Sequence, residues 1–162
     1  MSQSSASACG APGPDEHPTM ADRGWLAIAC RIAAEEPTPG TGLAAGAVVV
    51  AADGTELARG RAREGSREHA EEAALGALAA AGSRLGGATV YSSLAPCARR
   101  PDGGRPCAEL IRDAGVRRVV TAVRVPEGVA GSGDGGGLLE SAGVTVIELP
   151  EYADAAMKPN RP

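Results

Sequence analysis

The chain has 162 residues, a net charge of −4 and 43% hydrophobic residues, which suits one globular domain with a sizeable core. With one Trp, two Tyr and no Phe, it lacks the basic face and the aromatic stacking platform that nucleic-acid-binding proteins use. No apolar run approaches the length of a membrane span, so we expect a small-molecule ligand and neither a nucleic acid nor a membrane as partner.

The chain is predicted to hold one domain, residues 21–150, between two tails. Residues 1–20 are rich in Ser, Ala, Pro and Gly and are expected to be disordered, and residues 151–162 are expected to form a loose C-terminal tail. The N-terminus lacks the basic and apolar regions of a secretory signal. Four cysteines in such a chain indicate reduced thiols, so we expect a cytoplasmic protein. Cys9 and His17 lie in the first tail and receive no role.

The first predicted element is a helix in residues 21–37. Apolar side chains recur there at the i, i+3, i+4, i+7 spacing of one helix face. Asp22 is expected to cap its start and Pro37 to end it. Cys30 lies beside the apolar stripe and is expected to be a small core residue.

Strands and helices then alternate. Asp53-Gly54 separates the first two strands and predicts a hairpin. Helices separate the last three strands, which makes those strands parallel. The sequence therefore predicts an α/β fold, a three-layer α/β/α sandwich around a mixed five-stranded sheet. The strands are expected at 44–51, 55–60, 88–94, 117–123 and 144–149, and the helices at about 66–82, 107–115 and 137–143.

Three potential zinc ligands follow strand ends or begin helices. His69 offers an imidazole. Cys97 and Cys107, which have nine residues between them and are each preceded by Pro, offer two thiolates. Structural zinc sites usually take four protein ligands, whereas catalytic sites take three and leave one position for water. The sequence therefore predicts one Zn²⁺ per chain in a catalytic site. Helix N-termini are expected to stabilise both cysteines as thiolates.

Glu71 lies two residues after His69, close enough to reach a zinc-activated water without binding the metal. It would take a proton from that water and return it to the ring nitrogen and the leaving amine. H-x-E followed by P-C and a second Cys is the arrangement of the zinc nucleobase deaminases, in which the carboxylate is the general acid/base and not a ligand.

In these residues the chain resembles the cytidine deaminase-like superfamily, and within it the deaminase domain of the bifunctional riboflavin-biosynthesis deaminase/reductase. The resemblance covers roughly residues 22–149 and includes HAEEAAL, GATVYSSLAPC and RPCAELIRDAGVRRVV. It implies that His69, Cys97 and Cys107 are zinc ligands, that Glu71 is the proton shuttle, and that the chain forms a homodimer or a higher homo-oligomer. The family's reaction replaces an exocyclic amine of a pyrimidinone ribosylamine phosphate by a carbonyl oxygen and releases ammonia.

The departures from that family fall on substrate recognition. Gly42 stands where the family has an Asn that contacts the ring, and Ala95 replaces a common acidic residue. The loop between the cysteines is one residue longer and lacks the family's histidine, and no reductase-like segment is expected after the deaminase part. Backbone groups near Ala95 are candidates to read the amino group. Arg99, Arg100 and Arg105 are candidates to grip a phosphate or carboxylate, with a solvated basic loop or subunit contacts as the alternative.

The sequence thus predicts a zinc-dependent hydrolytic deaminase of an amino-substituted pyrimidine-type heterocycle, with the riboflavin-pathway diaminopyrimidinone phosphate as first guess. Deamination of another base, nucleoside or antibiotic-pathway intermediate is the alternative within that class. A non-catalytic zinc-stabilised protein is the alternative of another class, although the retained Glu71 argues against it. A disulfide between Cys97 and Cys107 is a third possibility.

Overall fold

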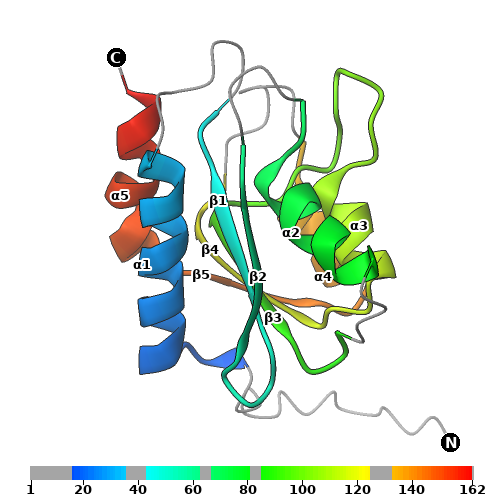
Figure 1. Cartoon of the computed structure of the whole chain (residues 1–162), viewed down its shortest axis with the longest axis horizontal. Helices are drawn as coiled ribbons and strands as arrows, with labels where there is room; N and C mark the ends of the chain where they lie inside the picture. The colour runs from blue at the N-terminus through cyan, green and yellow to red at the C-terminus, as the bar shows by residue number, and fades with distance from the viewer. Residues whose placement is uncertain (1–15, 36–42, 63–66, 81–84, 125–132, 162) are drawn as a thin grey trace, which may run out of the picture.

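The computed structural model describes residues 16–35, 43–62, 67–80, 85–124 and 133–161. A five-stranded sheet in the order β2-β1-β3-β4-β5 forms its middle layer. Figure 1 shows α1 and α5 on one face of the sheet and α2, α3 and α4 on the other, so the predicted three-layer α/β/α sandwich is confirmed. The elements are α1 (Met20–Ala34), β1 (Gly46–Val50), β2 (Glu56–Arg61), α2 (Ala70–Ala80), β3 (Thr89–Leu94), α3 (Cys107–Asp113), β4 (Arg118–Val123), α4 (Gly135–Ser141), β5 (Thr145–Glu148) and α5 (Ala153–Met157).

The sheet is mixed, as the order of the elements predicts. Strand β1 pairs antiparallel with β2 and β3, whereas β3, β4 and β5 are parallel. The Asp53-Gly54 turn joins β1 to β2, and Gly54 has a φ of +88°, which suits glycine. Because β3 and β4 are parallel and are followed by loops to α3 and α4, their carboxyl ends meet at one edge of the sheet.

Alternating side chains divide the core between the two faces of the sheet. Val48 and Val120 pack with α1, whereas Val49, Val90 and Val119 pack with α2, α3 and α4. Cys30 is 4% exposed within the α1 cluster, so its prediction as a small core residue is confirmed. No helix among the described residues is long and apolar enough to cross a membrane.

The start of α1 differs from the expectation. Thr19, not Asp22, is the N-cap: its hydroxyl accepts the Asp22 N–H at 3.1 Å, and the Asp22 carboxylate accepts the Thr19 N–H at 2.8 Å. This reciprocal pair is a capping box, in which an acidic side chain three residues into the helix completes the cap. Thr19 and Met20 therefore belong to the helix and not to an N-terminal tail, while Pro37 lies outside the described residues.

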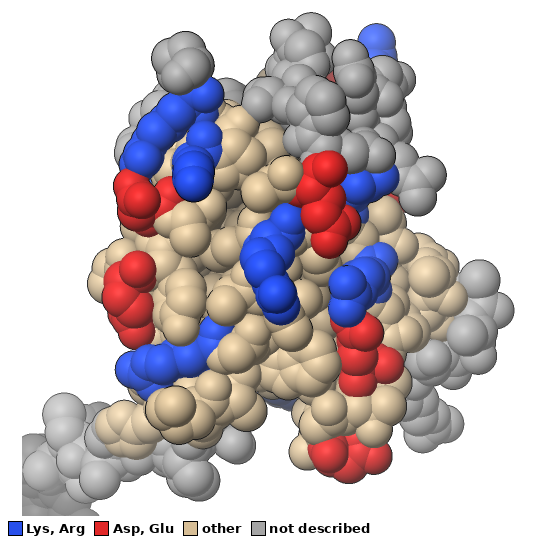
Figure 2. Space-filling view, turned by 60° about the vertical axis from the view of Figure 1, so that its left-hand side comes forward, with Lys and Arg blue, Asp and Glu red and all other residues tan. Residues whose placement is uncertain are grey.

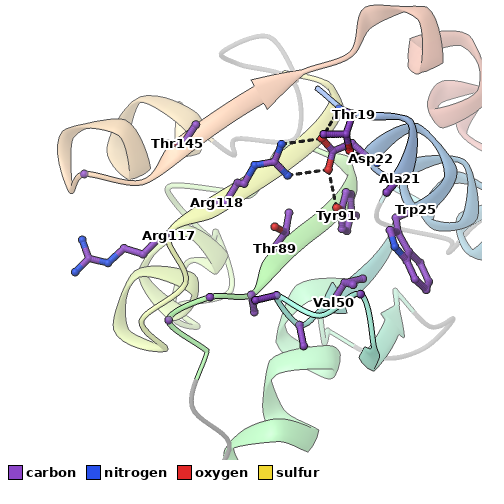
Figure 3. Close-up of a pocket in the computed structure, with 17 residues that line it drawn as sticks. Thr19, Ala21, Asp22, Trp25, Val50, Thr89, Tyr91, Arg117, Arg118 and Thr145 are labelled. Atoms are coloured by element: carbon purple, nitrogen blue, oxygen red, sulfur yellow. Dashed lines mark hydrogen bonds and ion pairs between the residues drawn. The ribbon is translucent and has the colours of Figure 1, made fainter. Parts of the chain in front are cut away.

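Asp22 is also the centre of a buried network that ties α1 to the sheet (Figure 3). Its carboxylate accepts the Tyr91 hydroxyl at 2.7 Å and both terminal nitrogens of Arg118 at 2.7 Å. These groups line a cavity of about 440 Å³ that also contacts Thr89 and Thr145. Thr89, Arg118 and Thr145 begin β3, β4 and β5, so the cavity lies at the amino ends of the parallel strands.

The C-terminal segment is not the loose tail that the sequence predicts. Two 3-10 turns, Pro150–Tyr152 and Lys158–Asn160, flank α5, which packs against α1 with Ala156 fully buried. The Asn160 side-chain amide accepts the Ala44 N–H at 2.5 Å and donates to the Ala44 carbonyl at 3.0 Å. These contacts give the segment tertiary partners that its short, polar sequence does not reveal.

Candidate metal centre

Three elements meet at the candidate metal centre. His69 directly precedes α2, Cys97 lies in the loop after β3, and Cys107 is the first residue of α3. Ligands in open α/β sheets bind beyond the carboxyl ends of the strands, and this centre lies at the carboxyl end of β3. The cavity beside Asp22 lies at the opposite edge and is separate from it.

The ligand atoms of His69, Cys97 and Cys107 all lie within 4.8 Å of one another. The His69 Nδ1 atom is 3.5 Å from Cys97 Sγ and 3.4 Å from Cys107 Sγ. With Zn–N of about 2.0–2.1 Å and Zn–S of about 2.3 Å, a tetrahedral zinc separates such nitrogen and sulfur atoms by about 3.6 Å. The three side chains therefore fit zinc, and a three-ligand set leaves one position for water or substrate.

The surroundings of the two thiols favour the thiolate form of one of them, Cys97, and not of Cys107. The pKa of the Cys97 thiol falls to about 4, because Cys107 donates hydrogen bonds to its sulfur and His69 lies beside it. The Cys107 N–H, at the start of α3, points to Cys97 Sγ at 3.3 Å. The pKa of Cys107 is raised by its bond to Cys97 and by burial. The first amide of α3 therefore supports Cys97 and not Cys107, and a bound metal must displace the remaining thiol proton.

The imidazole of His69 is half-buried beside the thiols. Its pKa is raised, chiefly because its ring faces the Cys97 sulfur. Cys97 and Cys107 are both free cysteines in the structure, so the alternative of a disulfide between them is wrong.

Glu71 lies in the first turn of α2 and is 5% exposed. Burial raises the pKa of its carboxyl group. Ser92, fully buried on β3, donates its hydroxyl to Glu71 Oε1 at 2.6 Å, and the same hydroxyl lies 2.5 Å from the Leu94 carbonyl oxygen. The hydroxyl fixes one carboxylate oxygen. Sequence reasoning missed Ser92, although two adjacent serines in an otherwise apolar strand are a signal that could have found it.

Arg100 fastens the inter-cysteine loop to the start of α2. Its five N–H donors all have acceptors: two on Asp102, one on Glu72, and the carbonyl oxygens of Arg67 and Arg105. The side chain is only 4% exposed. Burial lowers the pKa of its guanidinium, but the bonds to Asp102 and Glu72 outweigh that effect and raise it. This arrangement favours a role within the loop over a grip on substrate.

The remaining predicted substrate contacts are Arg105, Arg99, Ala95 and Gly42. Arg105 is exposed and pairs with Asp113. Arg99 is exposed, with its Nε atom 3.1 Å from the position of a Cβ on Gly133. The Ala95 N–H donates to the Val123 carbonyl at 2.9 Å, so this amide is occupied. Gly42 lies outside the described residues.

Known proteins resemble this chain over both sequence and fold. The family described as the cytidine and deoxycytidylate deaminase zinc-binding region matches residues 20–123. The riboflavin biosynthesis protein RibD of Aquifex aeolicus is 32% identical over 133 residues, which cover 77% of this chain and 34% of that protein. The chain thus spans about a third of the length of this relative.

Solved structures give the same picture. The diaminohydroxyphosphoribosylaminopyrimidine deaminase/5-amino-6-(5-phosphoribosylamino)uracil reductase of Thermotoga maritima is 29% identical with a TM-score of 0.74, covering 86% of this chain and 39% of that one. The dCMP deaminase of cyanophage S-TIM5 is 23% identical with a TM-score of 0.62, covering 82% of this chain and all of that one. The second likeness concerns the fold alone. Together with the His69, Cys97 and Cys107 cluster, the family match identifies zinc as the cofactor.

Proposed function

The chain belongs to the cytidine and deoxycytidylate deaminase family, and from that membership we propose that it catalyses the zinc-dependent hydrolytic deamination of an amino-substituted pyrimidine-type heterocycle. The observation that carries the proposal is the pairing of an open three-ligand cluster with a buried carboxylate two residues from one ligand. His69, Cys97 and Cys107 hold the metal. Bound zinc supplies a Lewis acid that activates water.

Glu71 moves the proton. Ser92 holds Oε1 in place, and the Glu71 carboxylate accepts a proton from the attacking water. The water oxygen forms a bond to the ring carbon that carries the amine, and Glu71 delivers the first proton to the adjacent ring nitrogen. Glu71 then transfers the second water proton from the new hydroxyl group to the amine, the carbon–nitrogen bond breaks, the hydroxyl becomes the carbonyl, and ammonia leaves. A non-catalytic zinc protein would gain nothing from a buried carboxylate at this position, because burying an ionisable group costs stability.

The substrate that we propose first is the diaminopyrimidinone ribosylamine phosphate of riboflavin synthesis. The identities with the Aquifex and Thermotoga proteins support this choice. Gly42 and Ala95 depart from the family at substrate-contacting positions, and Arg100 is occupied by its own loop. These features keep another amino-substituted base, nucleoside or antibiotic-pathway intermediate as the second candidate.

The test is ammonia release from zinc-loaded protein with a panel of substrates: the riboflavin-pathway compound, cytidine, dCMP and guanine. We expect release from the first compound and background rates from the others. Ammonia release from a different compound of the panel, and not from the first, would contradict the riboflavin-pathway compound as the substrate. If the zinc-loaded protein released ammonia from none of the four compounds, all of these substrates would be contradicted.

We also propose a reducing, cytoplasmic location and a homodimer or higher homo-oligomer. The three described cysteines are free thiols, which supports the location. Figure 2 shows basic and acidic side chains interspersed on one face, without the single-sign stripe that nucleic-acid binding requires. Light scattering of the purified protein tests the assembly, and a monomeric mass at micromolar concentration would contradict it.

A further inference from the structure

The first residue of α4 lies against the backbone of the metal-binding loop. Gly135 is buried, and a Cβ atom built on it would lie 1.7 Å from the Pro96 carbonyl oxygen, 2.6 Å from the Pro96 carbonyl carbon and 3.0 Å from that of Cys97. All three contacts are to backbone atoms, so no side-chain rotation can relieve them. Only a residue without a side chain fits between α4 and this loop.

The loop that Gly135 touches is held on its other side by α3. The Cys97 carbonyl accepts the Ala108 N–H at 3.0 Å, and Cys97 Sγ accepts the Cys107 N–H at 3.3 Å. The Pro96–Cys97 backbone is therefore clamped between the first turns of two helices. A displacement of this backbone from the α4 side is therefore expected to disturb its two hydrogen bonds with α3.

Backbone conformation does not explain the glycine. Gly135 lies outside the left-handed region that favours glycine, and it occupies a helical position where alanine has the higher propensity. From backbone conformation and helix propensity alone, an alanine at this position would be tolerated or would stabilise the helix. The close approach to Pro96 is the only feature among its described contacts that requires the glycine.

We propose that Gly135 is a positioning residue for the zinc site. It lets α4 approach the loop closely enough to hold the Cys97 thiolate where it can bind zinc together with His69 and Cys107. A side chain at position 135 moves the Cys97 thiolate away from that position. This inference rests on the proposed zinc function. It assigns to α4, which supplies none of the three metal ligands, a part in metal affinity.

The neighbouring glycine provides a matched control. A Cβ on Gly136 would meet the Arg124 guanidinium, 2.9 Å from its nearest nitrogen, and that group is the far end of a flexible, partly exposed side chain. Gly135→Ala and Gly136→Ala therefore add the same methyl group to the same helix turn. Only the first addition meets the metal loop.

The experiment measures zinc affinity by competition with a chelator, and the absorption spectrum of the Co²⁺-substituted protein, which reports the number and geometry of the ligands. We expect Gly135→Ala to lower zinc affinity by roughly 10- to 100-fold, the range found for residues that support metal ligands, and to alter the Co²⁺ spectrum. Gly136→Ala should match the wild type in both. Equal affinity and spectrum in Gly135→Ala and wild type would overturn the inference while leaving the zinc enzyme intact.

A second variant covers the case in which Gly135→Ala does not fold. Asp134 caps α4 by accepting the Gly137 N–H at 2.8 Å, and its side chain is exposed. Asp134→Ala loosens the same first turn without adding an atom, and we expect its zinc affinity to fall several-fold. Unchanged affinity in this variant would overturn the inference, whereas absence of zinc from the wild type would overturn the proposed function itself.

Discussion

At the scale of single residues, Ser92 determines how Glu71 is presented to the metal. Both side chains are buried, and the hydroxyl donates to Glu71 Oε1 at 2.6 Å. A hydrogen bond to a charged group contributes about 1.5–3 kcal/mol. We therefore expect Ser92→Ala to keep its zinc and its KM and to lower kcat by roughly tenfold, because the bond orients the proton shuttle and not the substrate.

Ser93→Ala is the matched control for that measurement. Ser93 is equally buried on the same strand, but its hydroxyl accepts the Gly46 N–H at 3.0 Å, away from Glu71. This variant should lose about 1 kcal/mol of stability and keep its kcat. Equal kcat values for Ser92→Ala and Ser93→Ala would show that Ser92 does not position the carboxylate.

Asp22 makes folding stability depend on pH in the acidic range. Burial alone would raise the pKa of its carboxyl group, but the bonds from Arg118, Tyr91 and Thr19 outweigh it and lower the pKa from 3.8 to about 2. A depressed folded-state pKa gives stability that is present above the unfolded value and lost as the pH falls through the folded value. The loss is therefore expected between about pH 4 and pH 2.

Urea unfolding of Asp22→Asn at several pH values tests this assignment. At pH 7 the variant should be less stable than the wild type by about 2 kcal/mol or more, since it also leaves Arg118 without its charged partner. The gap should narrow below pH 4. Asp154→Asn, an exposed carboxylate paired with Arg161, should stay within about 0.5 kcal/mol of the wild type. A gap for Asp22→Asn that is constant from pH 7 to pH 2 would contradict the ion pair.

At the scale of elements, helices on both faces of the sheet pack onto strand glycines. A Cβ on Gly46 would lie 2.2 Å from the Ala29 carbonyl oxygen of α1, and a Cβ on Gly60 would lie 2.2 Å from the Ala70 carbonyl oxygen of α2. Ala70 lies between His69 and Glu71, so Gly60 helps to set the distance between these two residues and the sheet. Close packing of small residues therefore compensates for a core with few aromatic side chains.

Gly60→Ala should destabilise the protein by about 1–3 kcal/mol or more, because the added methyl meets backbone atoms that no rotamer change can move. Gly76→Ala in α2 is the control: apart from its chain neighbours and its own helix backbone, no atom of the described residues lies within 4 Å of its Cβ position. The higher helix propensity of alanine should therefore stabilise the protein by up to about 1 kcal/mol. Thermal unfolding of the two variants checks the sign of each effect. Equal melting temperatures would contradict the close approach of α2 to β2.

At the scale of the whole molecule, the sequence was sufficient for features that depend on local pattern. The alternation of strands and helices, the parallel strands β3–β5 and the convergence of His69, Cys97 and Cys107 are all present in the structure. Hydrophobic periodicity, crossover geometry and ligand spacing are properties of short segments, so a single chain reveals them.

Contacts between distant residues could not be predicted in that way. Glu71 and Ser92 are 21 residues apart, Glu72 and Arg100 are 28 apart, and Asp22 and Arg118 are 96 apart. The helix α5 likewise depends on α1 for its apolar contacts. Such pairs form because the tertiary structure brings the two side chains together, and no local sequence pattern around either residue indicates the other.

One zinc ion and the Glu71 carboxylate are expected to act together in hydrolysis. The most direct test measures bound zinc and ammonia release in the same preparations of wild type and Glu71→Gln, with the riboflavin-pathway diaminopyrimidinone phosphate as substrate. We expect one zinc per chain in both proteins, and ammonia release that falls by at least about 100-fold in the variant. Equal rates in the two zinc-loaded proteins would contradict the assignment of Glu71 as the proton shuttle, and a wild type without zinc would contradict the metal centre.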